Sequence, residues 1–203
     1  MSSQPTTYLT PEEYLALERK AEFKSEYVDG EIVAMTGASR KHNLVVVNIT
    51  GEISQQLKGR SCEAYCNDMR VRIPSSRLYT YPDMVVVCGE PQFEDKEFDT
   101  LLNPTVIIEV LSKSTELYDR GKKFGFYRTI ESLAEYLLVA QDERHIEQYV
   151  RQPDGGWLLS EHRSPEDTVK LTSIQSSLEL REVYDKVAFS EAMRNEGLDR
   201  TAS

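Results

Sequence analysis

The chain has 203 residues, a length typical of one domain with a substantial hydrophobic core. Its 24 basic and 34 acidic side chains give a formal net charge of −10, which counts against a nucleic-acid or membrane partner unless basic residues cluster locally or metal ions intervene. The sequence has no run of 18 apolar residues and no visible signal peptide. We therefore expect one cytoplasmic domain over residues 1–203, with a frayed tail from about residue 195.

The cysteines and histidines predict neither a disulfide nor a zinc site. An odd number of cysteines without a signal peptide indicates free thiols, and no pair of Cys or His at ligand spacing completes a zinc site. The histidines are scattered and form no metal-type pair. These residues are Cys62, Cys66, Cys88, His42, His145 and His162.

The N-terminal third predicts a helix, a hairpin and a second helix. Thr10 and Glu13 form a capping box around Pro11, which predicts a helix to about residue 20. Asp29-Gly30 lies between two β-prone runs and indicates a two-residue hairpin within 26–33. Ser39 is a helix cap for an apolar pattern that continues to residue 57.

The remainder predicts a mixed sheet with one more long helix. We expect strands over 69–73, 81–88, 105–111, 135–139, 146–151 and 157–162, with a turn at 153–156. A charged, mobile loop is expected over 89–103, a helix over about 118–130, and a short helix near 181–186. The fold class is therefore α/β (α+β): a mixed central β-sheet flanked by helices, preceded by an N-terminal helix and hairpin.

Two acidic residues stand in or beside apolar strands. Glu109 interrupts the centre of the strand over 105–111, and Asp83 lies at the start of the strand over 81–88. A buried carboxylate is costly unless it is paired, protonated or bound to a metal. If the two strands are neighbours, the carboxylates converge, and a hard cation such as Mg²⁺, or Mn²⁺ in its place, would offset their repulsion.

A lysine on the following helix is placed to join them. Asp119, Lys123 and Tyr127 are spaced four apart and share one helix face, and Lys123 flanks the apolar stripe that faces the sheet. An ammonium there could orient a water or stabilise developing negative charge.

Each of these residues also has an ordinary structural explanation. Asp83 could cap a strand entry, and Glu109 could face water or pair with Arg70 or Arg72. Lys123 could form a surface pair with Asp119. His42 could cap a helix, and Glu26 could be an unremarkable hairpin residue.

The ordered set of motifs resembles the Uma-type restriction endonuclease family, which is common in cyanobacteria and belongs to the PD-(D/E)XK superfamily. The resemblance runs from Pro11-Glu-Glu-Tyr14 through Glu26-Tyr-Val-Asp-Gly-Glu31 to Glu179-Leu-Arg-Glu-Val-Tyr184, and it includes Pro82-Asp83, Glu109-Val-Leu-Ser112, the Asp119 to Tyr127 helix and Glu135-Tyr136. It implies a restriction-endonuclease-like core in which Asp83 and Glu109 bind the metal. Glu26 and His42 match recurrent family positions.

The sequence departs from the superfamily pattern in two places. The third strand usually reads acid-x-Lys, but Leu111 occupies the lysine position here, and the resemblance implies that Lys123 replaces that lysine. Ala140-Gln141 stands where a family-typical aspartate is expected, so we assign no catalytic role to that region.

The resulting hypothesis is a Mg²⁺-dependent endonuclease that hydrolyses DNA phosphodiester bonds. The catalytic residues would be Asp83, Glu109, Lys123 and Glu26, the metal ligands Asp83 and Glu109, and the accessory residues His42 and Asp119. The alternatives are a catalytically inactive nuclease-fold binding module and a metal-dependent phosphoesterase acting on small nucleotides.

The expected partners are DNA and a second copy of the chain. A homodimer would supply the two sites that cutting both strands requires. Local basic residues would hold the DNA: Arg40, Lys41, Arg70, Arg72, Lys113, Arg120 and Lys122.

Overall fold

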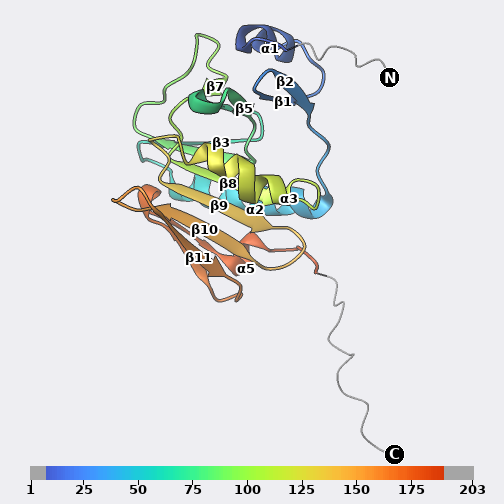
Figure 1. The fold of residues 1–203 in the computed structure, drawn as a ribbon. Coiled ribbons are helices and arrows are strands. Elements are labelled where there is room, and N and C mark those ends of the chain that lie inside the picture. Colours follow the sequence, from blue (N-terminus) through green and yellow to red (C-terminus); the bar gives the residue numbers. More distant parts are fainter. Residues whose placement is uncertain (1–7, 190–203) are drawn as a thin grey trace, which may run out of the picture.

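The computed structural model describes residues 8–189 (Figure 1). The helices are α1 (Pro11–Glu18), α2 (Arg40–Gln56), α3 (Glu116–Tyr118), α4 (Phe124–Tyr127) and α5 (Leu180–Val183), with the single-turn segments η1 (Pro74–Ser76), η2 (Asp119–Lys123) and η3 (Thr172–Ile174). The strands are β1 (Ser25–Val28), β2 (Glu31–Ala34), β3 (Cys62–Cys66), β4 (Arg70–Ile73), β5 (Leu78–Thr80), β6 (Met84–Cys88), β7 (Thr100–Leu101), β8 (Val106–Leu111), β9 (Glu135–Ala140), β10 (Ile146–Arg151), β11 (Trp157–His162), β12 (Thr168–Leu171) and β13 (Ser176–Glu179). The tail predicted from about residue 195 lies outside the described residues.

The strands form three sheets. The largest has the order β11-β10-β9-β8-β6-β3, and its β8–β9 pair is parallel while the other pairs are antiparallel. A five-stranded sheet, β2-β1-β5-β4-β7, contains the N-terminal hairpin, and β12 pairs with β13. In Figure 1 the hairpin and α1 lie at one end of the molecule, and β10 and β11 lie at the other.

The six-stranded sheet is covered on both faces. One face packs against α2, β12, β13 and α5 through a core that includes Val45, Ile49, Met84 and Ile108. The opposite face packs against α4 and the five-stranded sheet through a second core that includes Ile107 and Leu111. Because side chains alternate along a strand, Glu109 points to the same face as Ile107 and Leu111. That face carries the candidate site.

Several predicted elements are confirmed. The Thr10 side chain and Glu13 form the capping box of α1, and Ser39 caps α2 by accepting a hydrogen bond from the His42 amide. Asp29 and Gly30 both have positive φ and close the β1–β2 hairpin. The β10–β11 hairpin also has its predicted bounds. In residues 8–189, no helix is both long and apolar enough to cross a membrane.

The helix predicted over 118–130 is shorter and interrupted. It begins at Glu116, passes through the π-helical segment η2 and ends at Tyr127. A π-turn inserts one residue into the helical repeat, and such segments are frequent at functional sites. Lys123 and Phe124, which end η2 and begin α4, are both buried.

The prediction of free thiols is wrong for two of the three cysteines. Cys62 and Cys88 occupy directly paired positions on β3 and β6, with their Cα atoms 4.0 Å apart, and they form a disulfide. Cys66 is exposed and free. The pairing depends on strand register, which the spacing of the cysteines along the chain does not reveal.

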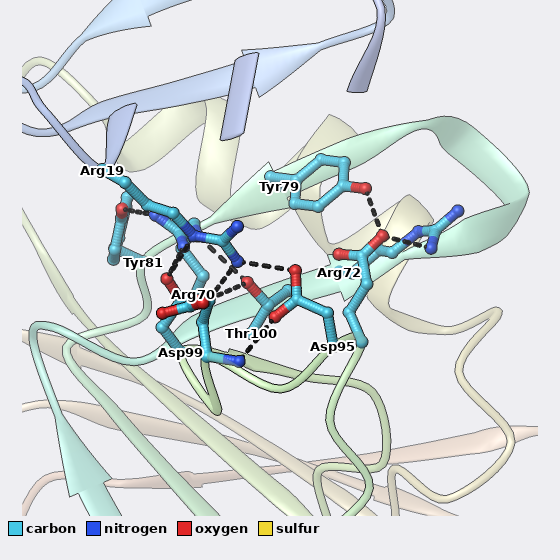
Figure 2. A network of polar contacts seen from close by, with 10 residues as sticks. Arg19, Arg70, Arg72, Tyr79, Tyr81, Asp95, Asp99 and Thr100 are labelled. Carbon is cyan, nitrogen blue, oxygen red and sulfur yellow. Dashed lines mark hydrogen bonds and ion pairs between the residues drawn. The ribbon is translucent and has the colours of Figure 1, made fainter. Parts of the chain in front are cut away.

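The charged loop over 89–103 is tied to the N-terminal sheet rather than loose. Figure 2 shows Arg19 and Arg70 converging on Asp99. Arg19 contacts Asp95 and Asp99 at 2.8 Å each, and buried Arg70 pairs with Asp99 and donates a hydrogen bond to Tyr81. These contacts hold the loop between α1 and β4.

Candidate active site

The two predicted metal ligands lie on neighbouring strands. β6 and β8 are antiparallel with Met84 opposite Ile108, so extending the register by one residue places Asp83 opposite Glu109. Asp83 Oδ2 accepts a hydrogen bond of 2.7 Å from the Val110 amide, which fixes the Asp83 carboxylate against β8. The neighbouring-strand arrangement on which the metal hypothesis depended is therefore present.

His42 holds the other oxygen of Asp83. Its Nε2 atom lies 2.9 Å from Asp83 Oδ1, and both side chains are largely buried. Because α2 begins at the Ser39 cap, its first turn delivers His42 to the end of β6. His42 thus orients the Asp83 carboxylate.

Lys123 lies among three carboxylates. Its Nζ atom is 2.9 Å from Glu109 Oε1, 3.1 Å from Glu26 Oε1 and 3.6 Å from Asp119 Oδ1. The side chain is 6% exposed. The structure therefore gathers Glu26 from the hairpin, Glu109 from the sheet and two residues of η2 at one point. Glu109 pairs with this lysine and with neither arginine considered from the sequence.

Burial and charge oppose one another in this cluster. Burial raises the pKa of the Glu109 carboxyl, while the Lys123 ammonium opposes that rise. Burial also raises the pKa of Asp119. Burial lowers the pKa of Lys123, but Glu109, Glu26 and Asp119 together outweigh it and keep that pKa well above its ordinary value. Lys123 is therefore a fixed positive charge at neutral pH.

The donor set fits a divalent metal ion. Three carboxylates (Glu26, Glu109 and Asp119) surround a single ammonium, and a fourth, Asp83, lies opposite Glu109 on the neighbouring strand, so the cluster is rich in negative charge. All four supply oxygen ligands, which hard cations such as Mg²⁺ and Mn²⁺ prefer. Asp83 and Glu109 lie opposite one another where β6 and β8 pair, so they are the first candidates to hold such an ion.

Sequence reasoning missed two hydroxyl groups in the site, those of Thr80 and Tyr118, and it gave no role to a third, that of Tyr127. Tyr127 donates a hydrogen bond of 2.8 Å to Glu109 Oε1, and Thr80 donates one to Glu26. The Tyr118 hydroxyl is buried without a hydrogen-bond partner among residues 8–189, and burial followed by the charge of Glu26 raises its pKa to about 12. Helical spacing signalled Tyr127, but it gave no sign of Thr80, which comes from β5.

Leu111 belongs to the hydrophobic core and not to the polar cluster. It is 4% exposed and lies in the same apolar cluster as Phe124. A lysine is absent from this strand position, and the ammonium at Glu109 comes from η2 instead.

Three of the basic residues predicted to hold DNA are engaged within the protein. Arg70 is buried against Asp99, Arg72 pairs with Glu94, and Arg120 pairs with Glu116 and Glu147. The Arg70 prediction is wrong because that side chain is 4% exposed. Arg40, Lys113 and Lys122 are exposed, and Lys41 is half-buried beside Asp142.

The comparisons with known proteins agree with this fold. Residues 11–182 match the family model Uma2, described as a putative restriction endonuclease. The chain belongs to the Uma2 family. This Uma2 protein is 42% identical over 156 residues to the uncharacterized Synechocystis protein sll1609, covering 77% of this chain and 88% of that protein. It is 37% identical over 187 residues to slr1290 of the same organism, covering 92% and 97%.

A solved structure has the same fold. A crystal structure from Anabaena variabilis, described as a putative nuclease, superposes with a TM-score of 0.71 at 20% identity, covering 89% of this Uma2 chain and 99% of that one. The mixed α+β, nuclease-like fold predicted from the sequence is confirmed. The family membership supports a nuclease in general terms.

Proposed function

We propose that this Uma2 protein is a metal-dependent endonuclease that hydrolyses DNA phosphodiester bonds. The observation that carries the proposal is the meeting of Glu26, Glu109 and Asp119 around the Lys123 ammonium, beside an Asp83 carboxylate fixed by His42. Buried carboxylates in excess of their cations are arranged at a cost in stability, and such arrangements mark functional sites.

Asp83 and Glu109 would hold a Mg²⁺ or Mn²⁺ ion. When bound, that ion would polarise the phosphate and lower the pKa of a water. The chain's own groups keep these ligands in place: the Val110 amide and His42 fix the two oxygens of Asp83, and Tyr127 fixes Glu109. The preorganised carboxylates need little rearrangement, because their hydrogen bonds are already formed.

Lys123 would act on the reacting phosphate group. It keeps its proton at Nζ at neutral pH, so it would donate hydrogen bonds to the attacking water or to a phosphate oxygen. Glu26 and Asp119 hold the ammonium in position. This role assigns to Lys123 the function of the lysine that is missing at Leu111.

DNA would have to approach the site of a protein whose net charge is negative. The net charge of −10 repels the phosphate backbone, so the bound ion and the exposed residues Arg40, Lys113 and Lys122 would have to provide local attraction. Two copies of the chain would place one site on each DNA strand. Light scattering of the purified protein, with and without duplex DNA, tests the dimer.

Cleavage assays test the proposal directly. Duplex, single-stranded and branched DNA are incubated with Mg²⁺ or Mn²⁺ and the wild-type protein, Asp83→Asn, Glu109→Gln or Lys123→Met. Asp68→Asn, which changes an exposed carboxylate paired with Lys24, is the matched control. We expect cleavage by the wild type and the control, and a loss of at least about 100-fold in the three site variants. Cleavage that survives Asp83→Asn and Glu109→Gln would refute the site.

Two other outcomes would replace the proposal. Hydrolysis of free or cyclic nucleotides without cleavage of DNA would indicate a phosphoesterase. No Mg²⁺ or Mn²⁺ binding by calorimetry, together with unchanged or improved stability of Glu109→Gln, would indicate an inactive binding module.

A further inference from the structure

The six-stranded sheet carries a second polar cluster beyond the candidate active site. Glu147 on β10 lies opposite Glu161 on β11, and His145, two residues before Glu147, points to the same face. One ligand atom from each of these three residues lies within 4.8 Å of the other two. Within residues 8–189, this is the one group of at least three His, Cys, Asp or Glu side chains whose ligand atoms all lie within that distance of one another.

His145 has an unsatisfied nitrogen directed into this cluster. The residue is 4% exposed, and its Nε2 atom has no hydrogen-bond partner among the described residues. That atom lies 3.4 Å from Glu161 Oε1 and 3.9 Å from Glu147 Oε1. A buried polar atom without a partner costs free energy, so such an atom calls for an explanation.

The backbone around His145 is held firmly. The His145 amide donates a hydrogen bond of 3.1 Å to the Tyr184 hydroxyl, and that hydroxyl donates one of 2.8 Å to the His145 carbonyl. Burial, followed by the positive charge of Arg163, lowers the pKa of His145. The neutral form of an imidazole is the form that can ligate a metal.

We propose that His145, Glu147 and Glu161 form a second metal site, which takes a divalent transition ion of the Zn²⁺ class. One imidazole nitrogen and two carboxylate oxygens form a ligand set that suits Zn²⁺, and a water would complete four-coordination. Mg²⁺ strongly prefers oxygen ligands, so it competes poorly at this site.

The second site is distinct from the first but lies in the same row of the sheet. Glu109 is opposite Leu138 on β9, Leu138 is opposite Glu147, and Glu147 is opposite Glu161. Two strand spacings separate the backbones of Glu109 and Glu147, which is about 10 Å. Both sites therefore face the layer that contains η2.

Arg120 competes with the ion for Glu147. Its guanidinium pairs with Glu147 Oε1 and, through Nε at 2.9 Å, with Glu116. Glu147 Oε2 accepts a hydrogen bond of 3.0 Å from Tyr149, and Arg163 lies 3.8 Å from Glu161. A metal ion must displace Arg120 from Glu147, so removal of the Arg120 charge will strengthen metal binding.

Metal titration of the full chain tests the proposal. The protein is stripped with a chelator, and Zn²⁺ binding is measured by calorimetry in an Asp83→Asn/Glu109→Gln background that disables the first site. Co²⁺ is then used as a spectroscopic probe of the ligand set. We expect one Zn²⁺ per chain, retained in millimolar Mg²⁺. Glu161→Gln and His145→Gln will each weaken binding at least tenfold, and Arg120→Gln will tighten it.

Matched controls separate this site from adventitious binding. His162→Gln changes the neighbour of Glu161 that points to the opposite face, and Cys66→Ser removes the exposed thiol. Both should leave Zn²⁺ affinity unchanged. Glu161 is exposed, so its variant should fold even if His145→Gln does not. No Zn²⁺ binding in the double-variant background, or undiminished binding by Glu161→Gln, would overturn the proposal.

Discussion

The ammonium of Lys123 lies 2.9 Å from Glu109 Oε1, although the lysine comes from a π-helical segment and the glutamate from the centre of a buried strand. The superfamily pattern has a lysine at the strand position that Leu111 occupies here, and Leu111 packs in the hydrophobic core. The ammonium that contacts Glu109 therefore comes from Lys123. In the proposed function, catalytic chemistry at Glu109 would depend on how η2 packs against the sheet. This relationship can be tested independently of nuclease activity.

Removal of the Lys123 charge should be strongly destabilising. Lys123→Met would leave Glu26, Glu109 and Asp119 buried without their cation, and breaking a buried ion pair in this way costs about 3–5 kcal/mol. Lys122→Met, which changes the exposed neighbouring lysine, should alter stability by about 0.5 kcal/mol or less. Urea denaturation at pH 7 measures both.

A double variant refines this prediction. Adding Glu109→Gln to Lys123→Met removes one of the stranded charges, so it should recover part of the lost stability. Equal effects of Lys123→Met and Lys122→Met on the free energy of unfolding would contradict the buried-pair interpretation.

His42 should control metal affinity by orienting Asp83. His42→Ala removes the contact with Asp83 Oδ1 but leaves the Val110 hydrogen bond to Oδ2 intact. Loss of such an orienting partner typically weakens metal binding about 10–100-fold. Calorimetric titration with Mn²⁺ should show this loss, and His42→Gln, which keeps a hydrogen-bond donor, should show a smaller one. Identical affinities in the wild type and His42→Ala would exclude the positioning role.

The ion pairs of Asp99 should make stability sensitive to acid. Arg19 and, after the opposing effect of burial, Arg70 hold the pKa of Asp99 well below its ordinary value. A carboxyl whose folded-state pKa is depressed contributes stability above its unfolded pKa of about 3.9, and that stability is lost as the pH falls toward the folded value. Asp99→Asn should therefore destabilise the protein most at neutral pH.

The measurement is the free energy of unfolding of wild type and Asp99→Asn between pH 7 and pH 2. The difference between them should be constant above about pH 5 and shrink below about pH 4. Asp68→Asn, at an exposed pair with Lys24, should show a much smaller difference throughout. A wild-type advantage that does not change down to pH 2 would show that Asp99 acts through packing and not through its charge.

Local sequence signals predicted much of this fold and identified the main residues of the candidate site. Asp29-Gly30 specified its hairpin because both residues adopt positive φ, and Thr10 and Ser39 specified their helix starts through side-chain caps. Glu109 was recognisable because a carboxylate interrupts an apolar strand. The catalytic roles of Asp83, Glu109, Lys123, Glu26, His42 and Asp119 remain predictions.

Features that depend on register and packing could not be read from the sequence. Cys62 and Cys88 pair only because β3 and β6 align them, and Glu147 meets Glu161 only across the β10–β11 hairpin. The search for pairs of histidines missed His145, whose neighbours are carboxylates. Arg70 looked like an exposed cation because the tertiary contact with Asp99 is 29 residues away in sequence. The π-turn of η2 likewise had no local signature.

The disulfide predicts a redox-dependent stability. Cys62 and Cys88 are 26 residues apart, and closing a loop of that length in the unfolded chain corresponds to about 3.5 kcal/mol on the chain-entropy model. The oxidised protein should therefore need more urea to unfold than the reduced protein. The Cys62→Ser/Cys88→Ser variant should resemble the reduced form and lose its response to dithiothreitol. Cys66→Ser, which changes the free thiol, should keep the full response. Equal unfolding midpoints for oxidised and reduced wild type would show that the disulfide adds no stability to that of the paired strands.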